Sequence, residues 1–170
     1  MTDPTRPTMD AVRGTILLCD QVYPTAGGKW IIAGTYTNWW TSDSPLVFTG
    51  GLSVYIRFQV EQPADYPCRI LLFDRMRPSN VPPIVEVGMT ARITDPLEPF
   101  ELGLKLPQFG IVSPTAPEQV PAGQPVGVIL SVWLQVNGKD LASCPLRIIF
   151  RNPQDVRQHD ADARPSGDLP

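Results

Sequence analysis

The clearest signal along the chain is a strict alternation of apolar and polar side chains, best seen over residues 52–61. One face of this segment carries Leu52, Val54, Ile56, Phe58 and Val60, while the other carries Ser53, Tyr55, Arg57, Gln59 and Glu61. Alternation with a period of two is typical of a β-strand with one buried and one solvated face. The segment therefore predicts a strand of an antiparallel sheet.

Seven further segments have strand character. Alternation recurs over residues 85–93, 100–106 and 126–136, and less regular apolar segments lie at 15–19, 29–37, 68–73 and 141–150. Turn residues separate them, including Gly27-Gly28 and the proline-containing loops 78–83 and 114–125. The pattern predicts an all-β, antiparallel β-sandwich of about eight strands, immunoglobulin-like or C2-like, with little or no helix.

Asn137-Gly138 indicates a two-residue hairpin with a type I′ turn. Continued without interruption, this hairpin would place Arg147 opposite Val128 on the apolar face of residues 126–136. An extra residue near Ser143–Pro145 would instead turn Leu146, Ile148 and Phe150 to that face. We therefore expect a β-bulge at Ser143–Pro145, where proline would be tolerated.

Composition supports little helix, because the chain contains 20 prolines, which interrupt helices. Residues 1–10 and 152–170 are polar and predict a disordered lead and a disordered tail around a single domain at 11–151. Within the tail, a short recognition motif is the alternative to a solvated segment. No apolar segment is long enough for a signal peptide or a membrane span, so we expect a cytoplasmic protein and no membrane partner.

The net charge of −3 and the scattered lysines and arginines argue against nucleic acid as a partner. Cys19, Cys68 and Cys144 are distant from one another in sequence and are expected to be buried free thiols in a reducing compartment. We expect no metal site and no cofactor, because the single histidine, His159, lies in the tail.

Catalytic chemistry has no clear residue set. His159 has no scaffold to hold it beside a nucleophile, and no phosphate-binding or zinc-protease motif occurs. A carboxylate pair or a calcium site could form only from acids near strand ends, namely Asp20, Asp43, Asp74, Glu86 and Asp95. We therefore expect no enzyme, with an unrecognised carboxylate site as the third reading of the function.

The aromatic residues Tyr36, Trp39 and Trp40 form the candidate binding site. They lie together at the end of a predicted strand. Neighbouring strand residues face opposite sides, so at most one tryptophan can point into the core. The other could stack on a sugar ring, anchor a protein interface, or cap the end of the sandwich. Trp30 and Trp133 are expected in the core or half-buried on a sheet.

The segments Leu18-Cys19-Asp20, Gly27-Gly28-Lys29 and Ile32–Tyr36, together with Val136–Leu141, resemble the hairpins of an uncharacterised bacterial family of small β proteins, known as a domain of unknown function. The resemblance covers roughly residues 13–150. It implies a β-sandwich and a bacterial cytoplasmic origin, but no activity.

Taken together, these features favour a non-catalytic interaction or structural domain that binds a protein partner or itself, because edge strands offer backbone pairing. The alternative is a small-molecule or carbohydrate-binding module that uses exposed aromatic residues.

Overall fold

The computed structural model describes residues 13–35, 37–48, 52–75, 80–116, 119–121, 124 and 126–152. The predicted lead at 1–10 and nearly all of the predicted tail at 152–170 lie outside these residues, so the proposed domain boundaries stay a prediction. The described residues form eleven β-strands and no α-helix, which confirms the all-β class. Within this part of the chain, no helix is long and apolar enough to cross a membrane.

All eight predicted segments are strands. They are β1 (Arg13–Pro24), β2 (Trp30–Thr35), β5 (Ser53–Gln59), β6 (Ala64–Asp74), β7 (Val85–Ile93), β8 (Phe100–Lys105), β10 (Val126–Val136) and β11 (Lys139–Phe150). Three short strands were not predicted, namely β3 (Asn38–Thr41), β4 (Leu46–Phe48) and β9 (Phe109–Ile111). A strand of three or four residues is too short to show alternation, which explains why the sequence pattern misses them.

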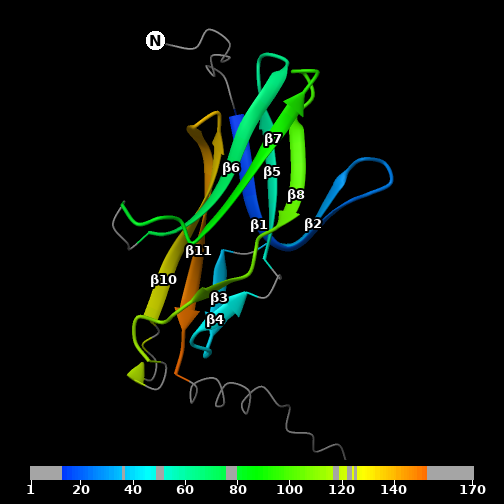
Figure 1. Ribbon diagram of the computed structural model, residues 1–170. Coiled ribbons are helices and arrows are strands. Elements are labelled where there is room, and N and C mark those ends of the chain that lie inside the picture. Colours follow the sequence, from blue (N-terminus) through cyan, green and yellow to red (C-terminus); the bar gives the residue numbers. More distant parts are fainter. Residues whose placement is uncertain are drawn as a thin grey trace, which may run out of the picture.

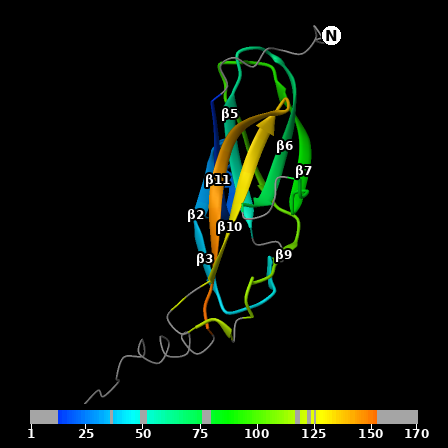
Figure 2. The same ribbon diagram turned by 90° about the vertical axis from the view of Figure 1, so that its left-hand side faces the viewer.

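The strands form two main sheets (Figures 1 and 2). The first has the order β2-β1-β5-β8 and is antiparallel throughout; the second has the order β3-β11-β10-β6-β7. We call them sheet A and sheet B. In sheet B, β3 runs parallel to β11, so the prediction of a purely antiparallel fold is wrong at this edge. The connection after β2 crosses from the edge of sheet A to the edge of sheet B, and β3 therefore joins a strand distant in sequence.

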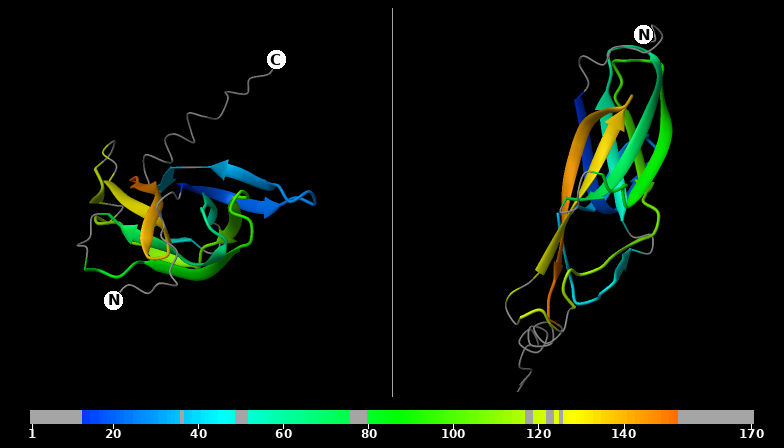
Figure 3. Two further views of the ribbon diagram at one scale, coloured as in Figure 1. Left: turned by 90° about the horizontal axis from the view of Figure 1, so that it is seen from above. Right: turned by 60° about the vertical axis from the view of Figure 1, so that its left-hand side comes forward.

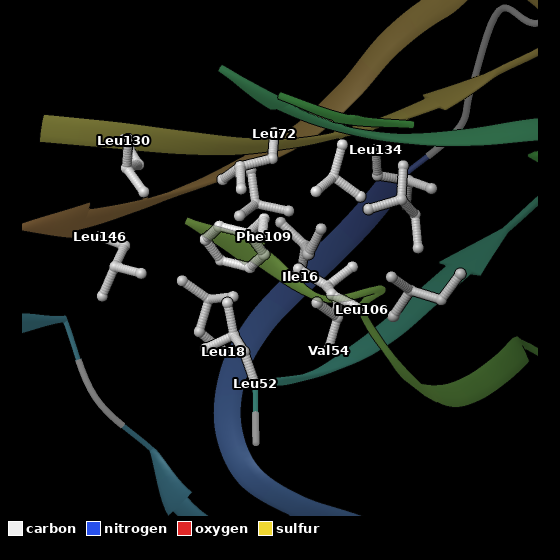
Figure 4. Packing of buried hydrophobic residues seen from close by; sticks show 14 of the residues in the cluster. Ile16, Leu18, Leu52, Val54, Leu72, Leu106, Phe109, Leu130, Leu134 and Leu146 are labelled. Carbon is white, nitrogen blue, oxygen red and sulfur yellow. The ribbon is translucent and has the colours of Figure 1, made fainter. Parts of the chain in front are cut away.

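One apolar core lies between the two sheets, and sheet B curves around it as a half-barrel (Figure 3, left). Leucines from both sheets point towards each other in Figure 4, among them Leu18 of β1, Leu72 of β6 and Leu130 of β10. Each of these side chains is at most 1% exposed. The apolar faces predicted for residues 52–60 and 128–134 are the faces that line this core. The prediction that the other face of residues 52–61 is solvated is wrong at Ser53 and Tyr55, which are both buried.

The β10–β11 hairpin has the predicted turn but a different bulge. Asn137 and Gly138 have φ values of 52° and 79°, as a type I′ turn requires. The register shifts at Leu141, because Leu134 pairs with Ala142 whereas Gln135 pairs with Asp140. The predicted bulge at Ser143–Pro145 is therefore wrong in position. Its expected consequence is confirmed, since Leu146, Ile148 and Phe150 are buried.

Pro145 needs no bulge because its nitrogen faces away from β10. The amide of Arg147, two residues later on the same strand, donates to the carbonyl of Thr37 just before β3. Amides two residues apart point to the same side of a strand, so the nitrogen of Pro145 also points away from β10. The proline thus removes no hydrogen bond from the β10–β11 ladder.

A small third sheet of β4 and β9 covers the end of the core next to β3. Phe48 of β4 stacks on Phe109 of β9, with ring centroids 4.7 Å apart. Trp39 of β3 contacts Phe48 edge-on at 5.1 Å. This aromatic cluster holds β3 against the core. It thereby also positions Trp40, the residue that follows Trp39.

Candidate functional site

The structure separates the three aromatic residues of the predicted binding site. Tyr36 lies outside the described residues. Trp39 faces the core, where it packs against Phe48, while Trp40 is 49% exposed on the outer face of sheet B. The prediction that at most one of the two tryptophans points inward is confirmed. Both belong to the separate strand β3 rather than to the end of β2.

Trp40 is covered on one side by a cation. The guanidinium carbon of Arg151 lies 3.7 Å from the centre of a Trp40 ring. This distance is well within the roughly 6 Å at which a cation and an aromatic face attract each other. The backbone amide of Arg151 also donates to the carbonyl of Thr41, which continues the β3–β11 pairing by one residue. Trp40 and Arg151 therefore form one composite surface.

A groove of about 420 Å³ begins at Trp40 and crosses the outer face of β3, β11 and β10. Volumes of about 300–1,000 Å³ are usual for ligand sites. Gly127, Ile129 and Ile149 supply an apolar floor, in which Ile149 is buried, while Asn38 and Arg147 supply the polar groups. Among the residues that the structure describes, no acidic side chain lines this groove, which we call the Trp40 groove.

Sequence reasoning missed the arginines of this site. Arg147, Ile149 and Arg151 alternate with the core residues Ile148 and Phe150, so the period of two already places them on one outer face, where Ile149 is also buried. The sequence pattern singled out Arg147 only for the hairpin register, and Arg151 is the last residue of the predicted domain. No local sequence pattern shows that β3 lies beside β11.

A second hollow of about 360 Å³ lies on the same face of sheet B, nearer β6. Phe73 and Trp133 form its apolar wall, and Val81, Pro82 and Ile84 come from the loop before β7. Trp133 is half-buried, as predicted. At the rim the amide of Gln135 donates to the carboxylate of Asp140 over 2.7 Å. Asp74, Asp140 and Arg75 all line this hollow, so its lining carries both negative and positive charge.

The β1–β2 hairpin folds back against sheet A. A Cβ added to Gly103 of β8 would lie only 2.5 Å from a methyl of Val22 and 2.8 Å from the Trp30 ring. The Trp30 ring also lies 6.4 Å from that of Tyr55. Trp30 is half-buried, in agreement with the prediction.

The opposite face of this hairpin is open to solvent. Tyr23 and Ile31 pair directly across the hairpin, and they are 46% and 40% exposed. The hairpin projects beside the body in Figure 1, and β2 forms the edge of sheet A. In the part of the chain that the structure describes, no strand pairs with its outer edge.

Three of the acidic residues near strand ends, Glu86, Asp95 and Asp20, have local structural contacts. Glu86 forms an ion pair with Arg69, and Asp95 accepts a hydrogen bond from the amide of Leu97 at 2.8 Å. The carboxylate of Asp20 lies over Gly34, which has a φ of +67°. No group of three histidine, cysteine or acidic residues in the described segments is arranged to hold a metal ion.

The cysteines are free thiols, with Cys19 and Cys68 buried and Cys144 half-buried. Burial raises the pKa of all three thiols, and that of Cys68 to about 11. A reactive cysteine needs a lowered pKa, because the thiolate is the nucleophile. These thiols therefore have the character of core residues.

The raised pKa values predict that stability falls at alkaline pH. An unfolded thiol loses its proton from about pH 8.5 upward, whereas the folded Cys68 keeps its proton until about pH 11. Between these values the unfolded state binds fewer protons, so the free energy of unfolding decreases as the pH rises. We expect a lower midpoint of thermal unfolding at pH 10 than at pH 8. Cys68→Ala should show a smaller decrease, and an equal decrease in both proteins would contradict the assignment.

Comparison with known proteins adds no relative. No protein-family model matches this chain, and no curated protein sequence matches it significantly. The resemblance to an uncharacterised bacterial family therefore stays a prediction.

Proposed function

We propose that this protein is a non-catalytic protein-interaction domain of the β-sandwich type, which binds an extended strand of a protein partner, or of a second copy, along the free edge of β2. The single observation that carries the proposal is the unprotected outer edge of this strand. Strand addition uses main-chain hydrogen bonds for affinity and side-chain contacts for specificity.

The direction of the free amides in β2 follows from the hairpin turn. The amide of Thr25 donates to the carbonyl of Lys29 at 2.7 Å. Hydrogen-bonded pairs alternate along an antiparallel ladder, so Ile31 and Ala33 point their backbone groups towards β1. Trp30 and Ile32 then point theirs to the outer edge.

The four edge strands of the two sheets differ in how they are protected. Charged side chains on edge strands discourage pairing with other chains, as do short edges. β7 carries Glu86 and Arg92, β8 carries Glu101 and Lys105, and β3 is four residues long. The six residues of β2, by contrast, include no charged residue and no proline. Among the described edges, β2 is the one best suited to accept a strand.

Ala33→Lys is expected to weaken partner binding by about tenfold or more. Ala33 is exposed, so the lysine should leave the fold intact. A charge on an edge strand opposes pairing, because the added strand would bring it out of water. The measurement is capture of partners by the tagged full-length protein, together with sedimentation of the protein alone to detect self-association.

Ala33→Thr is the matched control, since threonine is neutral and favours strands. It should keep the partner or the oligomer that Ala33→Lys loses. A protein that captures no partner and stays monomeric would contradict the proposal, as would a partner equally retained by both variants.

A carbohydrate-binding module is the second candidate, favoured by the half-exposed Trp40 above a groove of ligand size. A sugar ring stacks on an open indole face. Trp40→Ala would then abolish binding in a glycan screen, while the core-facing Trp39 would not contact the sugar.

A further inference from the structure

The outer face of β11 carries Arg147 and Ile149, and Arg151 continues this row one residue past the end of the strand. Their backbone amides show that the strand stays regular here, because Arg147 donates to Thr37 and Arg151 donates to Thr41. Residues two apart on a strand lie about 6.7 Å apart, which puts the two arginines about 13 Å from each other. The apolar side chain of Ile149 lies between them.

The two arginines have no carboxylate partner within the described part of the chain. The ion pairs found there join Arg57 to Glu101, Arg69 to Glu86 and Arg92 to Asp65. Arg147 instead lines the Trp40 groove, and Arg151 lies over the Trp40 ring. Arg147 thus lines the groove and Arg151 lies at its Trp40 end, and none of the described residues that line it is acidic, although the chain as a whole has a net charge of −3.

We propose that the Trp40 groove is a second binding site, which takes an extended acidic peptide segment of a partner protein. An extended peptide places alternate side chains on one side with the same spacing as β11. Carboxylates at its first and fifth positions match Arg147 and Arg151. An apolar side chain at the third position lies over the floor between them, against Gly127 and Ile129. Guanidinium groups suit carboxylates because they offer several donors in one plane.

The lining favours a peptide over a sugar acid. Sugars are recognised by many polar side chains and an open aromatic face, whereas the described lining of this groove has one neutral polar side chain, Asn38. One face of Trp40 is already covered by Arg151. This arrangement orients the guanidinium for a carboxylate.

The site does not depend on strand addition at β2. It lies on the outer face of sheet B, whereas β2 is at the edge of sheet A. The variant Ala33→Lys should bind the acidic peptide like the unaltered protein, so that the two proposals can fail separately.

The test is fluorescence anisotropy with the full-length protein and the fluorescein-labelled peptide Ser-Glu-Ser-Leu-Ser-Glu-Ser at low salt. We expect saturable binding that weakens as salt is added. The double variant Arg147→Gln/Arg151→Gln should weaken binding by about tenfold or more. Gly127→Val keeps both charges but fills the floor, and it should also weaken binding. The Cβ that it adds lies 3.5 Å from the carbonyl of Ile148, an ordinary contact.

The matched control is Arg69→Gln/Arg92→Gln, which removes the same charge from the same face of sheet B, at arginines that are exposed and already paired. It should change the affinity less than about twofold. An equal loss of affinity in this control would show that the peptide is attracted by the overall positive charge of this face, and it would contradict a specific site at the Trp40 groove. Equal binding of a peptide with glutamine in place of both glutamates would overturn the recognition of carboxylates. Equal binding of a peptide with two adjacent glutamates would overturn the proposed spacing. Tighter binding of oligogalacturonate would assign the groove to acidic sugars, and no peptide binding at about 1 mM would overturn the proposal outright.

Discussion

Leu130→Ala is expected to lower the free energy of unfolding by about 2–5 kcal/mol, the usual cost of a large-to-small change in a packed core. Leu130 is fully buried and points from β10 into the space between the two sheets (Figure 4). Leu146 lies directly opposite it on β11, and it is also fully buried. Removing the leucine side chain leaves a cavity that strands held in two ladders cannot easily close.

The neighbouring Ile129→Ala is the control, because Ile129 is half-buried on the outer face of the same strand. It should lower the free energy of unfolding by only about 1 kcal/mol, since less of its apolar area is taken out of water. Denaturation by urea, followed by circular dichroism, measures both values. Equal decreases in the free energy of unfolding for the two variants would contradict the assignment of Leu130 to the core face of β10 and Ile129 to its outer face.

The local part of this fold could be predicted from the sequence. Alternation in β5 and β10 depends only on which side of a strand faces the core, and each strand shows that choice in its own residues. The Asn137-Gly138 turn is equally local, because its positive φ values favour these two residue types. Such features need no knowledge of which strands are neighbours.

The pairing of distant strands could not be predicted in this way. β3 joins β11, more than a hundred residues later in the chain, and its four residues carry no periodic signal. The position of the bulge at Leu141 could not be predicted either. The buried face of β11 requires one extra residue in the strand, but it does not say where that residue lies. Several positions between the turn and Leu146 would restore the same register.

The candidate site shows the same division. Alternation predicted that one of Trp39 and Trp40 faces outward, but the choice between them depends on Phe48 and the cap formed by β4 and β9. The contact of Arg151 with Trp40 needs the β3–β11 pairing. Function at such sites depends on residues that only the tertiary structure brings together.

The close packing of the β1–β2 hairpin on β8 links stability to the proposed interaction edge. Gly103 leaves room for Val22 and Trp30, and any side chain at this position would meet both. A valine there must push the hairpin outward or distort β8. Overpacking of this kind costs about 1–3 kcal/mol, and the displaced hairpin would no longer hold β2 in place.

Gly103→Val is therefore expected to lower the free energy of unfolding by about 1–3 kcal/mol and to speed hydrogen exchange of the β2 amides that pair with β1. Gly88→Val is the matched control, since a Cβ at Gly88 of β7 would have no atom within 4 Å. Valine favours strands, so this control should leave stability unchanged or raise it by up to about 1 kcal/mol. Exchange measured by mass spectrometry should locate the effect of Gly103→Val in residues 19–35. Equal hydrogen exchange of the β2 amides in both variants would show that the contact with Gly103 does not position the β1–β2 hairpin. The edge offered for strand addition would then not be held in place by packing on β8.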